Sequence, residues 1–148
     1  MCKQEQSNHT VLVVDDDACI CDAVTDILEL ADIQTMVASN GLQGLNLYKE
    51  NSDSIDLVIL DLMMPIMDGE TALRKLHAYD PNVNVLMASG SGNPQNIRHL
   101  LSLGAINFLH KPYDLHSLLD AVDKGLQHKH NPVPFSDITP RISPASFA

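Results

Sequence analysis

The sequence contains no apolar run that approaches the roughly 20 residues a membrane-spanning helix needs. Its first residues, Met1 to Thr10, are polar and include no hydrophobic segment of the kind that a secretory signal peptide carries. A hydrophobic content of 45% with 19% charged residues is typical of a globular chain. We therefore expect a soluble protein located in the cytoplasm.

Cysteines and basic residues are also few. The three cysteines are an odd number, which agrees with a reducing compartment, and the spacing of Cys19 and Cys21 favours small apolar fillers over a pair of metal ligands. Nine Lys and Arg against 19 Asp and Glu give a net charge of −10. This charge opposes direct contact with nucleic acids or anionic membranes, so proteins and metal ions are the expected partners.

At 148 residues the chain has room for one domain. From Thr10 onward, short apolar runs alternate five times with amphipathic stretches, the pattern of a βα-repeating protein. We expect a domain over 10–127, preceded by a polar extension, 1–9. Four of the eight prolines fall within 128–148, so this segment is interpreted as a Pro- and Ser-rich flexible tail or a truncated linker.

The apolar runs predict five strands, at 11–14, 33–38, 57–60, 83–88 and 105–110. Helices fill the intervals, and their predicted inner faces include Leu42, Leu101 and Leu115. Because strand–helix–strand crossovers are right-handed, such a chain can form a three-layer α/β/α sandwich. The expected fold is flavodoxin-like, with a five-stranded parallel sheet of order 2-1-3-4-5.

The third predicted strand ends abruptly in one carboxylate, Asp61. Pro65 excludes a helix directly after it, so 62–68 must be a loop. In the predicted strand order the first and third strands are neighbours, and ligands bind beyond the carboxyl ends of such strands. Asp15 and Asp16, which follow the first strand, are therefore expected to converge with Asp61 in one crevice.

Two further polar residues are expected at the same edge of the sheet. Ser89 ends the fourth strand and Lys111 follows the fifth. Each residue alone has an ordinary explanation, such as a helix cap or surface charge, but the set in this order indicates a site. Clustered carboxylates call for a cation, and oxygen ligands select Mg²⁺ or a similar ion. Asp61 can then act as a nucleophile toward phosphate, with Lys111 and Ser89 binding the phosphoryl oxygens.

The chain strongly resembles the receiver domain of two-component response regulators. The resemblance spans about residues 10–127 and is carried by VLVVDDD at 11–17, LDLMMPIMDG at 60–69, LMASG at 86–90 and GAINFLHKP at 104–112. It implies that Asp61 takes a phosphoryl group from the phosphohistidine of a sensor histidine kinase or phosphotransfer protein. It also implies a signalling phosphoacceptor, which catalyses only its own phosphorylation and dephosphorylation.

The resemblance assigns the metal ligands. It implies that Asp16, Asp61 and the backbone carbonyl of Met63 bind Mg²⁺ or Mn²⁺ directly, with Asp15 acting through water. Lys111 would pair with the phosphoryl group.

The resemblance also assigns the switch. Ser89 and Phe108 would turn inward after phosphorylation and remodel the surface formed by the fourth helix, fifth strand and fifth helix. The bond between Lys111 and Pro112 is expected to be cis. Expected partners are a downstream protein or a missing effector domain, and a phosphorylation-dependent homodimer is a further hypothesis.

Three alternatives were weighed against this interpretation. A hydrolase of the haloacid-dehalogenase type needs a second acid two residues after the nucleophile, where this chain has Met63. A nucleotide binder is suggested by the loop 90–92, but Gln95 occupies the last position of a G-x-G-x-x-G motif and no P-loop lysine follows. A receiver-like interaction module that is never phosphorylated remains the main rival.

Overall fold

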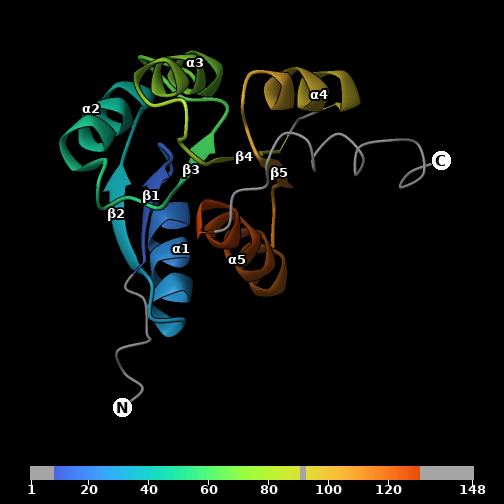
Figure 1. Cartoon of the computed structure of the whole chain (residues 1–148). Helices are drawn as coiled ribbons and strands as arrows, with labels where there is room; N and C mark the ends of the chain where they lie inside the picture. Colours follow the sequence, from blue (N-terminus) through green and yellow to red (C-terminus); the bar gives the residue numbers. More distant parts are fainter. Residues whose placement is uncertain (1–8, 91–92, 131–148) are drawn as a thin grey trace.

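Five strands and five helices alternate along the chain in the computed structural model, which describes residues 9–90 and 93–130 (Figure 1). The strands are β1 (Thr10–Val14), β2 (Gln34–Ala38), β3 (Leu57–Asp61), β4 (Val85–Ser89) and β5 (Asn107–His110). The helices are α1 (Ala18–Leu30), α2 (Gly41–Asn51), α3 (Gly69–Tyr79), α4 (Pro94–Ser102) and α5 (Leu115–His130). None of the helices in these ranges combines the length and the apolar character needed to cross a bilayer.

All neighbouring strands are parallel, and their order is β2-β1-β3-β4-β5. Helices α2, α3 and α4 pack on one face of the sheet and α1 and α5 on the other (Figure 1). The predicted flavodoxin-like sandwich is therefore confirmed. The register pairs Val14 with Leu60 across β1 and β3, so Asp15 and Asp61, one residue further on, lie beside each other.

The three central strands of the sheet, β1, β3 and β4, are buried on both faces. Within β1, Leu12 and Val14 face the layer of α2, α3 and α4, whereas Val11 and Val13 face α1 and α5. All five residues of β1, β3 and β4 are buried. This explains why the sequences of these strands are apolar without alternation, as is typical of a parallel sheet covered by helices.

The prediction that three of the leucines face the core is wrong. Leu42, Leu101 and Leu115 are 43%, 41% and 50% exposed. Each of these helices buries only a narrow stripe against the sheet, which Leu45, Leu100 and Leu118 occupy. Adjacent residues such as Leu100 and Leu101 lie about 100° apart around a helix, so only one of the two reaches the core.

Helix starts follow the capping signals of the sequence. Side chains of Asp17, Asn40, Asp68 and Asn93 accept backbone N–H groups in the first turns of α1, α2, α3 and α4. Asp114 does the same before α5, where its Oδ1 accepts the N–H of Ser117 at 2.7 Å. Helix α5 continues to His130, three residues past the end of the expected domain, and the rest of the expected tail lies outside the described residues.

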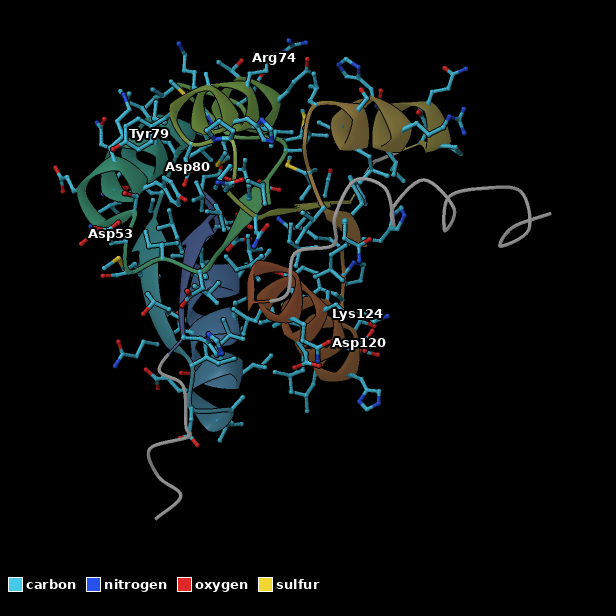
Figure 2. All side chains as sticks on the ribbon, in the orientation of Figure 1. Asp53, Arg74, Tyr79, Asp80, Asp120 and Lys124 are labelled. Carbon is cyan, nitrogen blue, oxygen red and sulfur yellow. The ribbon has the colours of Figure 1, made fainter. Side chains whose placement is uncertain are left out.

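Helices α2 and α3 are joined by a side-chain hydrogen bond. The hydroxyl of Tyr48 donates to Oδ2 of Asp80 at 2.7 Å, and Tyr79 packs edge-on against the ring of Tyr48. Figure 2 shows Tyr79 and Asp80 at the end of α3 that lies beside α2. Burial raises the pKa of Tyr48, and the hydrogen bond to Asp80 adds to this, so the phenol stays a neutral donor. These contacts fix the two helices that support the loop after Asp61.

The loop between β3 and α3 is tightly folded. Met67 donates its N–H to the carbonyl of Pro65 at 2.7 Å, and Ile66 between them has a φ of 70°, which is strained for a β-branched residue. Gly41, the first residue of α2, donates its N–H to the Met67 carbonyl at 3.2 Å. At the far end of the loop, Gly69 donates its N–H to the carbonyl of Leu62 at 2.8 Å.

The close approach at Gly69 leads to a stability prediction. A Cβ at this position would collide with the backbone of Asp61 and Leu62, whereas a Cβ at Gly90 meets no described residue nearer than 3.8 Å. We expect Gly69→Ala to lower the free energy of unfolding by about 1–3 kcal/mol and Gly90→Ala to leave it within about 1 kcal/mol, measured by urea denaturation. Equal stability of the two variants would contradict the tight fold of this loop.

Candidate functional site

Three carboxylates meet at the carboxyl ends of β1 and β3. Asp61 is the last residue of β3 and Asp15 follows β1 directly; both are 5% exposed. Asp16 is exposed. One oxygen atom from each of the three side chains lies within 4.8 Å of the others, and in the described part of the chain this is the group suited to hold a metal ion. The predicted convergence is confirmed.

Lys111 bridges two of these carboxylates. Its Nζ donates to Oδ2 of Asp15 at 2.7 Å and to Oδ1 of Asp61 at 3.0 Å. Lys111 reaches this position from the end of β5, where its N–H donates to the carbonyl of Ser89 at 2.9 Å. The peptide bond between Lys111 and Pro112 is cis, as expected. The lysine thus ties together the carboxyl ends of β1, β3 and β5.

The acidic triplet divides into three roles. Asp17 is the N-cap of α1, so among the three acids after β1 helix capping accounts for Asp17 alone. Both oxygens of Asp15 are engaged, because Oδ1 accepts the N–H of Asp17 at 2.9 Å and Oδ2 accepts Lys111. Asp16 makes no hydrogen bond or ion pair with the described residues. The carboxylate of Asp16 is therefore better placed than that of Asp15 to coordinate a cation directly.

The pKa values reflect the crowding of charges. Burial raises the pKa of Asp61 above its ordinary value; the hydrogen bond from Lys111 opposes this, and the charges of Asp15 and Asp16 add to it. Burial by itself lowers the pKa of Lys111, but its hydrogen bonds to Asp15 and Asp61 outweigh burial and leave the pKa raised. One ammonium is thus held firmly charged, yet it does not compensate the negative charge around Asp61. A bound cation would supply the missing positive charge.

The remaining predicted residues lie around this cluster. Ser89, the last residue of β4, is 2% exposed, and it lies one strand away from Asp61. Phe108 in β5 is half-buried against the core on the α2, α3 and α4 side, with its ring 5.0 Å from that of His110. Met63 stands two residues beyond Asp61 with its side chain 67% exposed. The metal ligation by the Met63 carbonyl and the switch movements of Ser89 and Phe108 stay predictions.

One supporting contact was not foreseen from the sequence. Cys21 is buried, and its Sγ donates to the backbone carbonyl of Asp15 at 3.3 Å. Burial, followed by the charge of Asp15, raises the pKa of this thiol to about 11, so it stays protonated and able to donate. The prediction that Cys21 is a small apolar filler is confirmed by its place on the buried stripe with Val24 and Leu28, but its contact with Asp15 was not predicted. The same prediction is wrong for Cys19, which is exposed.

The fold and the site together define the chain as a parallel α/β protein with a candidate metal site at the carboxyl edge of its sheet. A doubly wound parallel sheet carries a cluster of three carboxylates where the strand order reverses, between β1 and β3. A lysine from the end of a third strand points into this cluster. Hard oxygen ligands of this kind fit Mg²⁺ or a similar ion.

Comparison with known proteins identifies the family. The model of the response regulator receiver domain matches residues 11–123, and the chain belongs to this family. It is 36% identical to the chemotaxis protein CheY of Treponema pallidum over 125 residues, which cover 81% of this chain and 84% of that protein. It is 34% identical to the sporulation initiation phosphotransferase F of Bacillus subtilis, covering 84% of this chain and 98% of that protein.

Solved structures agree with this assignment. A response regulator receiver domain protein from Clostridium thermocellum superposes with a TM-score of 0.78 at 30% identity, covering 82% of this chain and 97% of that one. CheY of Borrelia burgdorferi, in a complex of CheX, CheY, BeF₃ and Mg²⁺, gives a TM-score of 0.77 at 33% identity, covering 78% of this chain and 87% of that one. The family and the fold expected from the sequence are therefore confirmed.

The buried charge at Asp61 leads to a second prediction. Because burial disfavours its ionised form, we expect Asp61→Asn to raise the free energy of unfolding by about 0.5–2 kcal/mol in metal-free buffer. The exposed Asp53 is the control, and Asp53→Asn should change stability by no more than about 0.5 kcal/mol. Urea denaturation measures both, and a destabilised Asp61→Asn would show that the ion pair with Lys111 outweighs the cost of burial.

Proposed function

We propose that this domain is a phosphoacceptor in two-component signalling and that Asp61 carries the phosphoryl group. The observation that supports this most directly is the bridge from Lys111 to Asp15 and Asp61 at the acidic cluster. A lysine held charged beside a nucleophilic carboxylate is suited to bind the oxygens of an incoming phosphoryl group. The domain would act as a signalling switch that catalyses only its own phosphorylation and dephosphorylation.

The chemistry is a transfer between two nucleophiles. Oδ1 of Asp61 accepts Lys111, which leaves the other carboxylate oxygen to attack the phosphorus of a phosphohistidine. A P–O bond forms as the P–N bond breaks, and the histidine of the donor leaves with the bonding electrons and takes up a proton. Attack of water on the phosphorus of the resulting acyl phosphate breaks its bond to Asp61, releases inorganic phosphate and returns Asp61 to its carboxylate. Lys111 and Ser89 would hold the phosphoryl oxygens in both steps.

A divalent ion fits the site, and Mg²⁺ is the proposed cofactor. Asp16 and Asp61 would bind it directly with the backbone carbonyl of Met63, and Asp15 would act through water, since both of its oxygens already accept protein hydrogen bonds. When bound, the ion supplies positive charge that offsets the phosphoryl oxygens and the carboxylates. Mn²⁺ has the same preference for oxygen ligands and could replace it.

The proposed partners follow from this role. A sensor histidine kinase or a phosphotransfer protein would supply the phosphoryl group. The output would be read on the surface of α4, β5 and α5, where Ser89 and Phe108 would transmit the change from Asp61. A downstream protein or an attached effector domain would recognise that surface, and phosphorylated copies of the domain could also pair through it.

Small phosphodonors test the acceptor role without a kinase. Incubation with phosphoramidate and Mg²⁺ should add the mass of one phosphoryl group, measured by intact-protein mass spectrometry. Asp61→Asn should abolish the added mass, because the amide is not a nucleophile, whereas Asp53→Asn should be labelled like the native chain. An unchanged mass of the native protein at saturating donor would refute the proposal and leave the interaction module as the explanation of the fold.

Metal binding is tested by stability. A ligand that binds only the folded state stabilises it by RT ln(1 + [L]/Kd), or about 2.7 kcal/mol at a hundredfold excess over Kd. We expect Mg²⁺ to raise the urea midpoint of the native chain in this logarithmic manner, and Asp16→Asn to remove most of the effect. Asp53→Asn should respond like the native chain. A rise of the same size in Asp16→Asn would exclude this residue as a direct ligand.

A further inference from the structure

Helix α4 buries fewer residues than any other helix in the described part of the chain. Of its nine residues, all of them described, Leu100 is the one that is buried. Helix α3 in comparison buries Ala72, Leu73 and Leu76. A helix with so little buried apolar surface has a low free-energy cost of local displacement. Side-chain contacts at its surface therefore have a large relative influence on its position.

A side-chain hydrogen bond joins α4 to α3. Nε2 of His99 lies 3.1 Å from Oε2 of Glu70, which belongs to the first turn of α3. The carboxylate accepts, so His99 donates from Nε2. Arg74, one turn further along α3, donates to the same oxygen from Nη2 at 3.1 Å and holds the Glu70 side chain in place. Figure 2 shows Arg74 on the outer side of α3.

The contact lies next to the loop that follows Asp61. His99 and Glu70 line a hollow of about 210 Å³ together with Leu62 and Met63, the first two residues of that loop. The hollow leaves space between the loop and α4, so α4 is not held there by close packing. A rearrangement of the loop therefore has room to shift α4 once the contact between His99 and Glu70 is broken.

We propose that the contact between His99 and Glu70 is a latch that holds α4 against α3 and restrains the response of the domain to phosphorylation. This proposal rests on the proposed function of Asp61 and adds a residue pair that sets how readily the switch operates. The latch is closed in the structure described here. Phosphorylation would have to break it, so its removal lowers the cost of reaching the switched state.

The first test is hydrogen exchange of α4 amides in the full-length protein without phosphodonor, measured by mass spectrometry. His99→Ala and Glu70→Ala should each accelerate exchange in residues 93–102 by about two- to fivefold, the range that an exposed pair supports. The double variant should be no faster than the single variants, because both remove one contact. Alanine is a better helix former than histidine, so propensity alone would slow exchange in His99→Ala.

A matched control uses an exposed ion pair that does not involve α4. Lys124 lies 3.2 Å from Asp120 within α5, and Figure 2 shows both side chains on the surface of that helix. Asp120→Ala should leave exchange of α4 unchanged. Unchanged exchange of α4 in both His99→Ala and Glu70→Ala would overturn the latch.

The second test is the rate of phosphoramidate labelling. His99→Ala removes a hydrogen-bond donor, whereas Glu70→Ala removes a negative charge. Simple electrostatic effects on phosphoramidate would therefore differ between the two variants. The latch instead predicts that both variants are labelled about two- to fivefold faster. Faster exchange with unchanged labelling in both would refute the restraint on phosphorylation. If the native chain is not labelled at all, the proposed function fails, and the exchange experiment still decides whether the contact holds α4.

Discussion

The ammonium group of Lys111 lies between Asp15 and Asp61, and the order of the site depends on this interaction. It connects three strand ends that are far apart in the sequence, and it offsets part of the charge that burial concentrates there. The compensation is incomplete, because burial, together with the charges of Asp15 and Asp16, still raises the pKa of Asp61. Three carboxylates therefore share one ammonium group, an arrangement that fits a further cation.

The loop after Asp61 shows how the fold maintains this arrangement. A strained φ at Ile66 and the close approach of Gly69 to the strand end are both tolerated because the surrounding contacts fix the backbone. Gly41 at the start of α2 binds the same loop from the other side. The hydrogen bond from Tyr48 to Asp80 in turn fixes α2 against α3. Rigidity is thus concentrated on the side of Asp61 that faces α2 and α3.

Helix α4 shows the opposite character. It is anchored by Leu100 and by an exposed contact to Glu70, and a hollow separates it from the loop that follows Asp61. A two-state element needs a small free-energy difference between its arrangements, and sparse burial provides this. The domain therefore combines a firmly held loop after Asp61 with a weakly held helix nearby, and the switch proposed above relies on this contrast.

The sequence by itself determined the strand order, the capped helix starts and the convergence of Asp15, Asp16 and Asp61, because buried parallel strands and right-handed crossovers leave few alternatives. Only the tertiary structure decided which side chains face the core and which oxygens are free. Leu42, Leu101 and Leu115 proved exposed, both oxygens of Asp15 proved to be engaged, and Cys21 was found to support Asp15. These outcomes depend on how a helix is rotated against the sheet and on contacts between distant residues, and the local apolar pattern specifies neither.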